Sequence, residues 1–165
     1  MIEKIKRGQL QISFGMIFSV ILIIIFLVFG FYAIKTFFNV GTSASTVKFI
    51  SELQNDIDRI WKSTESSEKK EYYLSSRISY VCFVDFSVPA RGENIEFYTN
   101  LRRGYYGEEN MIFYPFGSSE VESAKIKNID MEYIIQTNNP YCVKNEGKIS
   151  FILSKDYGEA LVKIR

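Results

Sequence analysis

Two cysteines are the side chains of this sequence whose chemistry is most readily assigned. Cys82 and Cys142 lie too far apart for a CxxC redox motif, and two cysteines alone do not make a structural zinc site. In an oxidising compartment they could pair as a disulfide, which would close a loop of about 60 residues and stabilise the fold by about 4 kcal/mol. Two buried free thiols are the alternative. We expect the disulfide, which would make both cysteines structural rather than catalytic.

The segment 102–107, Arg-Arg-Gly-Tyr-Tyr-Gly, has the second group of side chains with binding potential. Its glycine spacing fits neither GxGxxG nor GxxxxGK, so it does not predict a phosphate-binding loop. Arg102 and Arg103, next to Tyr105 and Tyr106, could stack on bases or sugars, although a flexible, exposed tyrosine loop is the simpler interpretation. We expect these four residues to form the best candidate surface for a partner or a glycan.

Catalysis is not expected from the rest of the chain. Histidine is absent, which removes the commonest general base and the commonest metal ligand. Asp56 and Asp58 would lie on different faces of a helix, so they do not form a carboxylate pair. The net charge of +1 gives no strong field for nucleic acid. The sequence therefore predicts no enzyme, no cofactor, no metal site and no nucleic-acid partner.

The N-terminal segment that precedes these residues is strongly apolar. No residue from Gly8 to Ile34 is charged, and residues 16–29 are almost wholly apolar. A helix rises about 1.5 Å per residue, so ~20 such residues cross a hydrocarbon core of ~30 Å. A segment that is apolar on every side has no face for water, which argues against a soluble core helix. We predict a transmembrane helix over residues 9–38, with membrane lipid as its partner.

The charges that flank the apolar segment predict its orientation. Lys4, Lys6 and Arg7 precede it, whereas Lys35 stands alone on the other side until Lys48. The positive-inside rule then places the N-terminus in the cytoplasm and the C-terminal domain outside, in a single-pass protein of the cell membrane. The apolar run exceeds the about 7–15 residues of a secretory signal, and no A-x-A site follows, so we expect the helix to be retained.

Residues 6–14, Lys-Arg-Gly-Gln-Leu-Gln-Ile-Ser-Phe, form the junction before this helix. The junction resembles the class III signal of archaeal type IV pilin-like proteins, in which a short basic leader ends in a small residue and Gln begins the mature chain. The resemblance covers the first quarter of the chain at most. It implies that a prepilin peptidase cuts between Gly8 and Gln9, so that residues 1–8 are the leader.

The same resemblance implies a structural role. Losing the leader would free the helix to leave the lipid and pack against sister subunits, because its apolar side chains exchange lipid for protein contacts at little cost. Bacterial-type pilins usually carry Glu as the fifth mature residue, where this chain has Ser13. This departure favours a minor, divergent or non-filamentous relative. The alternative is an uncleaved single-pass protein whose outer domain binds a partner.

The remaining residues predict an α+β domain over residues 46–165. Residues 39–45 contain Gly41 followed by Thr and Ser, which predicts a hinge between two helices. Apolar residues spaced by three and four from Val47 to Trp61 predict an amphipathic helix that ends near Ser63. The polar residues 64–71 are interpreted as a loop.

Segments rich in β-branched and aromatic residues follow, and they predict strands. They are residues 77–86, 111–114, 131–135, 148–153 and 160–164. The last two would form a terminal hairpin with its turn near Gly158. We therefore expect the amphipathic helix to pack on a mainly antiparallel sheet of about five strands.

Overall fold

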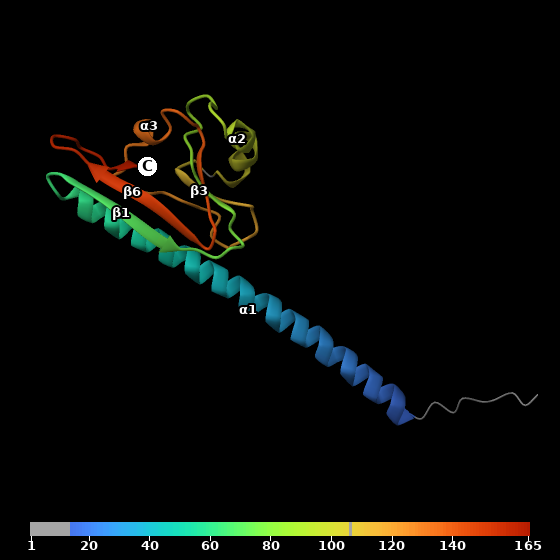
Figure 1. Ribbon diagram of the computed structural model, residues 1–165. Coiled ribbons are helices and arrows are strands. Elements are labelled where there is room, and N and C mark those ends of the chain that lie inside the picture. Colours follow the sequence, from blue (N-terminus) through green and yellow to red (C-terminus); the bar gives the residue numbers. More distant parts are fainter. Residues whose placement is uncertain (1–13, 106) are drawn as a thin grey trace, which may run out of the picture. The chain divides into compact units, whose positions relative to one another are not determined.

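The computed structural model describes residues 14–105 and 107–165 (Figure 1). The chain divides into two compact units, one that ends at Phe38 and one that comprises Asn39–Arg165. Helix α1 (Phe14–Trp61) provides all the described residues of the first unit and the first element of the second.

Residues 39–45, for which a hinge is predicted, are helical, and the division between the two units falls at their start, between Phe38 and Asn39. The hydroxyl-bearing residues do not cap a new helix. The hydroxyls of Ser45 and Thr46 instead donate hydrogen bonds to the carbonyl oxygen of Thr42, at 2.8 and 2.9 Å. Ser and Thr can make such bonds to the preceding turn without ending a helix, so the residues that suggested a cap are accommodated within α1.

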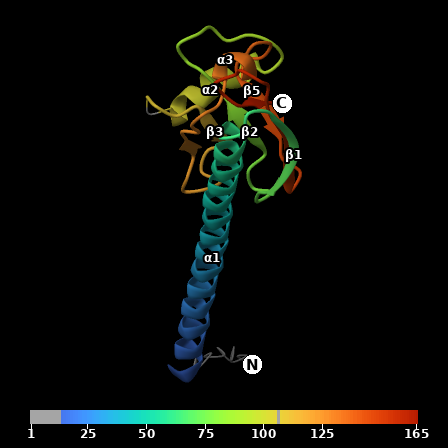
Figure 2. The same ribbon diagram turned by 90° about the vertical axis from the view of Figure 1, so that its left-hand side faces the viewer.

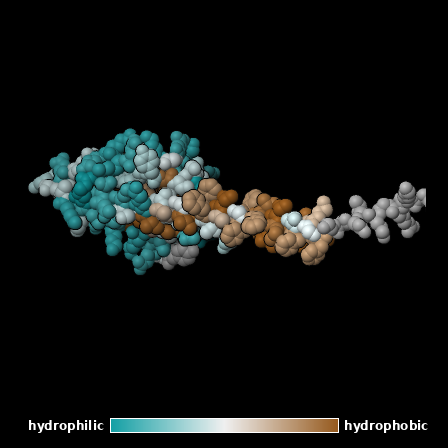
Figure 3. All heavy atoms as spheres, turned by 90° about the horizontal axis from the view of Figure 1, so that it is seen from below, coloured by the Kyte–Doolittle hydropathy of each residue, from teal (hydrophilic) through white to brown (hydrophobic). Residues whose placement is uncertain are grey.

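The first unit has its apolar side chains exposed from Phe14 to Phe38. Figure 3 shows hydrophobic residues gathered along this part of α1, in contrast to the mostly hydrophilic surface elsewhere on the visible face. By length and composition, α1 could cross a membrane.

The second unit buries one face of α1, as the spacing predicts. Phe49, Leu53, Ile57 and Ile60 are fully buried or nearly so, and they recur at intervals of four, four and three residues. The helix ends at Trp61, two residues before the predicted end. Figures 1 and 2 show strand β1 running beside these last turns.

The described strands form two antiparallel sheets rather than the one sheet predicted. The three-stranded sheet has the order β1-β6-β7, and its strands are Ser66–Tyr73, Lys148–Lys155 and Lys163–Ile164. The four-stranded sheet has the order β4-β3-β2-β5, and its strands are Ser123–Ala124, Met111–Tyr114, Tyr80–Phe83 and Tyr141–Lys144. The α+β class and the antiparallel pairing are confirmed.

Aromatic rings join α1 to both sheets. The ring of Phe49 lies 5.5 Å from Tyr72 of β1 and 6.0 Å from Phe113 of β3, both in edge-on contact. Phe83 of β2 contacts Phe151 of β6 at 5.9 Å. Edge-to-face pairs add to the free energy of apolar burial. The core therefore lies where the helix and the two sheets meet.

The terminal hairpin is confirmed, with a shorter second strand. Leu153 of β6 is opposite Ile164 of β7, and Gly158 in the connection has a φ of +83°. Glycine populates this left-handed region without the cost that a Cβ atom brings.

Two predicted segments have different structures. The loop predicted over residues 64–71 is wrong, since most of it belongs to strand β1. The strand predicted over residues 131–135 is also wrong, because Met131–Ile134 form helix α3. There the side chain of Asp130 accepts a hydrogen bond from the backbone N–H of Tyr133 at 2.9 Å, which caps the helix and overrides the strand propensity.

Candidate functional site

The predicted disulfide between Cys82 and Cys142 is confirmed. The two residues are directly opposite each other in β2 and β5, with their Cα atoms 4.0 Å apart. Neither cysteine is free, so the alternative of two buried thiols is wrong. The bond joins two neighbouring strands, although the two cysteines are separated by 60 positions in the sequence.

A second, smaller apolar cluster covers Cys82 and includes residues of α2 (Ile95–Leu101), a helix that the sequence did not predict. The ring of Phe97 lies 5.1 Å from Tyr80 of β2 and 5.3 Å from Tyr114 of β3. Helix α2 is thereby attached to the four-stranded sheet through aromatic contacts. The disulfide belongs to a packed structural region.

The predicted partner surface divides into two parts. Arg102 and Arg103 lie in the short helix η1 (Arg102–Gly104) and are exposed. Tyr105 is half-buried: its ring lies 4.8 Å from Phe86, and its hydroxyl donates to the carbonyl oxygen of Gly107 at 2.9 Å.

Three of the residues assigned a role from sequence are not located by the structure. Tyr106 of the predicted partner surface and the junction residues Gly8 and Gln9 lie outside the described residues. Of the predicted surface, the two arginines are therefore the exposed groups that the structure places.

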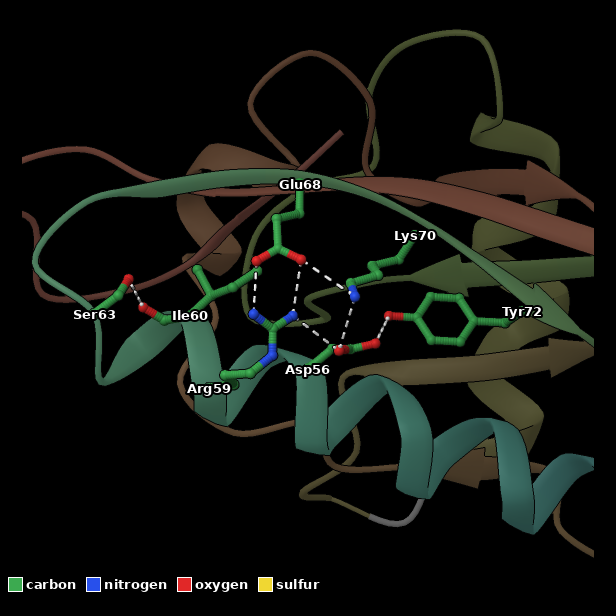
Figure 4. A network of polar contacts seen from close by, with 7 residues as sticks. All are labelled: Asp56, Arg59, Ile60, Ser63, Glu68, Lys70 and Tyr72. Carbon is green, nitrogen blue, oxygen red and sulfur yellow. Dashed lines mark hydrogen bonds and ion pairs between the residues drawn. The ribbon is translucent and has the colours of Figure 1, made fainter.

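A network of charged side chains joins α1 to β1 (Figure 4). The guanidinium of Arg59 donates to both carboxylate oxygens of Glu68, at 2.6 and 2.9 Å, and to Asp56 at 3.1 Å. The ammonium of Lys70 lies 3.2 Å from Glu68 and 3.5 Å from Asp56. The hydroxyl of Tyr72 donates to Asp56 at 3.0 Å. Two acidic and two basic side chains thus balance their charges.

The pKa values of Glu68 and Tyr72 in this network lie far from neutral pH. Hydrogen bonds from Arg59 and then Lys70 lower the pKa of Glu68 to about 2, from an ordinary value of 4.5. Burial, and then the nearby Asp56 carboxylate, raise the pKa of Tyr72 well above its ordinary range. A general acid or base works best when its pKa lies near the operating pH. The network is therefore suited to holding the helix on the strand.

The other flank of α1 is held by uncharged and charged polar groups together. The side chain of Gln54 accepts from the backbone N–H of Lys127 at 2.8 Å and donates to Asp58 at 2.8 Å. Asp58 also accepts from the side-chain amide of Asn128 at 2.9 Å. Asp56 and Asp58 thus act on different sides of the helix, as the sequence predicted.

The exposed face of α1 in the second unit is hollowed into a mainly apolar groove of about 640 Å³. Its lining residues are Val40, Ser43, Ala44, Val47, Lys48, Ser51, Glu52 and Glu120. The backbone N–H of Glu120 donates to the hydroxyl of Ser43 at 3.1 Å, which fixes one wall.

The groove was not predicted, because the spacing of apolar residues placed Val47 on the buried face of a helix that begins after a hinge. Val47 is 53% exposed, so that placement is wrong. The missed signal is the spacing of Val40, Ala44, Val47 and Ser51, which forms a second stripe once α1 is continuous.

Within residues 14–105 and 107–165, no cluster of three or more acidic or cysteine side chains is placed to hold a metal ion. Comparisons with protein-family models, curated proteins and solved structures found no match.

Proposed function

We propose that this protein is a membrane-anchored, pilin-like structural or minor assembly subunit of a cell-surface filament or a related secretion-type assembly. The observation that carries the proposal is the division of α1, a single helix of 48 residues, into an apolar exposed part and a part that belongs to the second unit. Its side chains are apolar and exposed up to Phe38, and from Thr42 onward one face is buried in an antiparallel domain.

The first part of α1 is suited to anchoring the chain. Residues 14–38 span about 37 Å at ~1.5 Å per residue, which exceeds a hydrocarbon core of ~30 Å. The basic residues Lys4, Lys6 and Arg7 favour a cytoplasmic N-terminus. The disulfide Cys82–Cys142 supports a second unit on the outer side, where such bonds persist.

The continuity of α1 supports an assembly role over a plain anchor. The helix that enters the lipid is also the helix that contributes Phe49, Leu53 and Ile57 to the core of the outer domain. A subunit of this kind moves from membrane to assembly by exchanging lipid contacts of its helix for contacts with sister helices. The charged leader opposes this transfer, so its removal between Gly8 and Gln9 by a prepilin peptidase would permit it.

A second candidate is an uncleaved single-pass protein with an outer binding domain. It is favoured by Arg102 and Arg103, which are exposed and have no ion-pair partner within 4 Å among the described residues. Exposed arginines are frequent anchors for protein partners.

The deciding experiment is to identify the N-terminal residue of the protein purified from its own membranes, by intact-mass and terminal-peptide mass spectrometry. A chain that begins at Gln9 supports the pilin-like function. Recovery of full-length protein alone would contradict it and favour the second candidate. Gly8→Phe should abolish cleavage, because the residue before the scissile bond is no longer small. The matched variant Gly8→Ala keeps a small residue there and should still be cleaved.

A further inference from the structure

Strand β1 has backbone groups that face away from its sheet. It is the outermost strand of the three-stranded sheet and pairs with β6 alone in that sheet. Opposite Lys69, Ile152 of β6 exchanges its N–H and C=O with Arg165 on its other side, at 2.8 and 3.0 Å. Lys69 therefore directs its own N–H and C=O away from β6.

The same orientation recurs along the strand, because inward-bonded and outward-facing positions alternate in an antiparallel ladder. The outward-facing residues, here called the β1 edge, are Ser67, Lys69, Glu71 and Tyr73. Within residues 14–105 and 107–165, no backbone hydrogen bond is made to these positions from outside the β1–β6 pair. Their side chains are all exposed. An open edge of this kind is a template on which an extended peptide adds a further strand.

The charged residues of β1 that face α1 do not close this edge. Inward-pointing charges often protect a sheet edge from pairing, because an added strand would have to cover them. Here the ammonium of Lys70 lies 3.2 Å from Glu68 and 3.5 Å from Asp56. Figure 4 shows the side chains of Lys70 and Glu68 pointing from β1 toward α1. Their charges are therefore balanced within the domain.

A polar groove of about 710 Å³ adjoins the β1 edge. It is lined by residues 70–73 of β1 and by Lys48, Glu52 and Asn55 of α1, among others. Successive side chains of a strand point to opposite faces, so an added strand would direct every second side chain to the α1 side, where this groove lies. In strand addition, main-chain hydrogen bonds supply affinity, and pockets for alternate side chains supply specificity.

The exposed face of β1 determines which charges an added strand should have. The ammonium of Lys69 lies 3.8 Å from Glu71, and its side chain is 64% exposed. Glu71 also lies 3.2 Å from Lys148 of β6. Opposite charges directly across a strand pair stabilise it, and like charges destabilise it. A carboxylate opposite Lys69 and a cation opposite Glu71 would therefore complement this face.

We propose that the β1 edge binds an extended segment of another protein as an antiparallel strand, with a basic residue two positions before an acidic one. The antiparallel direction gives this order, because the partner runs from Glu71 toward Lys69. The proposal goes beyond the proposed function and involves no residue of the apolar unit that ends at Phe38.

Strand β1 of a second copy is the other occupant with this order of charges, since Lys69 precedes Glu71 by two positions. The register that pairs Lys69 with Glu71 also puts Lys70 directly opposite its own counterpart. Like charges in that position destabilise a strand pair. A segment with an uncharged residue between its basic and acidic residues avoids this repulsion, so a different protein fits the edge better.

The test is binding of a synthetic peptide to the full-length chain in detergent micelles, measured by fluorescence anisotropy. The probe is fluorescein-labelled Thr-Val-Thr-Lys-Thr-Glu-Thr-Val-Thr, whose lysine and glutamate would lie opposite Glu71 and Lys69. The control peptide exchanges its lysine and glutamate, which puts like charges at both positions. We expect the control to bind about tenfold more weakly. No saturable binding of the probe, or equal binding of the two peptides, would overturn the proposal.

A matched variant exchanges the charges on the protein instead. Lys69→Glu together with Glu71→Lys should reverse the preference, so that the control peptide binds about tenfold more tightly than the probe. Both side chains are exposed, so the variant should remain folded. An unchanged preference would show that the peptide binds elsewhere.

Backbone methylation separates strand addition from charge attraction. In the proposed register, the N–H groups of the probe's lysine and glutamate face the β1 edge, and those of the threonines beside them point away. N-methylation of the lysine and glutamate should therefore abolish binding, whereas N-methylation of two of these threonines should change the affinity by less than about threefold. Equal effects would overturn strand addition.

The oligomeric state distinguishes the second copy from another protein. We expect Lys69→Glu to leave the mass of the full-length chain in micelles unchanged. A dimer that this substitution abolishes would assign the edge to β1 of a second copy and overturn the proposal. None of these results bears on the pilin-like function, because that function is decided by the N-terminal residue.

Discussion

Lys155 and Trp61 join the C-terminal end of α1 to strand β6: the ammonium of Lys155 donates a hydrogen bond to the carbonyl oxygen of Trp61 at 2.6 Å. It also donates to the carbonyl oxygen of Ser63 at 3.0 Å. The last carbonyl groups of a helix have no partner within the helix, and a cation there is favoured by the helix dipole. The end of α1 is therefore stabilised by a residue that arrives almost a hundred positions later.

Lys155→Met should destabilise the folded protein by about 1–2 kcal/mol, because it removes charge-assisted hydrogen bonds while keeping most of the side chain's length. The measurement is denaturant unfolding in detergent micelles. Lys69→Met, at an exposed position of β1, should change the free energy of unfolding by less than about 0.5 kcal/mol. Equal effects of the two substitutions would show that Lys155 acts only as a surface charge.

Phe49→Ala should have a larger effect, because this ring is fully buried between the two sheets. We expect a loss of about 3–5 kcal/mol, from the lost burial and the cavity that remains. Lys62→Ala, at an exposed residue directly after α1, is the control and should be nearly neutral. A loss below about 1 kcal/mol for Phe49→Ala would contradict the packing of this ring against both sheets.

Removing the disulfide with Cys82→Ala and Cys142→Ala together should lower the free energy of unfolding by about 4 kcal/mol, since the bond restricts the unfolded chain. Thermal unfolding with and without reductant gives the comparison. Reductant should destabilise the unaltered protein and have no effect on the double variant. A reductant effect of the same size on the double variant would show that the cysteines are not responsible.

The α1–β1 network predicts a stability that falls in acid. The pKa of Glu68 is lowered to about 2 in the folded protein, against an ordinary value of 4.5. A group with a lowered folded pKa stabilises the fold above its unfolded pKa, and this contribution is lost as the pH falls from about 4.5 to about 2. Glu68→Gln should therefore reduce the slope of stability against pH in this window.

Arg59→Gln provides the matched comparison, because it keeps the carboxylate of Glu68 and removes its strongest donor. The pKa of Glu68 should then rise toward its ordinary value. The pH range over which its contribution to stability is lost should therefore end at a higher pH. Unfolding measured at a series of pH values checks both variants. An unchanged slope in Glu68→Gln would contradict the role of this ion pair.

The sequence predicted the parts of the fold in which local spacing and burial agree. The residues Phe49, Leu53 and Ile57 were assigned correctly because a three-and-four spacing on a helix marks its buried face. Strand β1 was missed because its helix-facing residues include Glu68 and Lys70, whose partners lie on α1. A strand whose inner face is charged has no apolar alternation to recognise.

Other features depend on contacts between distant residues and have no local signal. The fully buried side chain of Asn139 donates to the carbonyl oxygen of Asp85 at 2.8 Å and accepts from its N–H at 3.2 Å. Asn145 donates in the same way to the carbonyl oxygens of Ser75 and Ile78, at 2.9 and 2.8 Å. Both residues look like ordinary turn asparagines in the sequence. The groove was hidden for a related reason, since it appears only when α1 continues through Gly41.

The disulfide also determines how the domain responds to proteases. Everything from Phe83 to Tyr141, including α2, α3 and the exposed arginines of η1, lies between the two bonded cysteines. A single peptide-bond cleavage in this interval produces two fragments that stay covalently joined, and shedding requires reduction or a second cut elsewhere. The surface that carries Arg102 and Arg103 could therefore be nicked while both fragments remain attached to the helix.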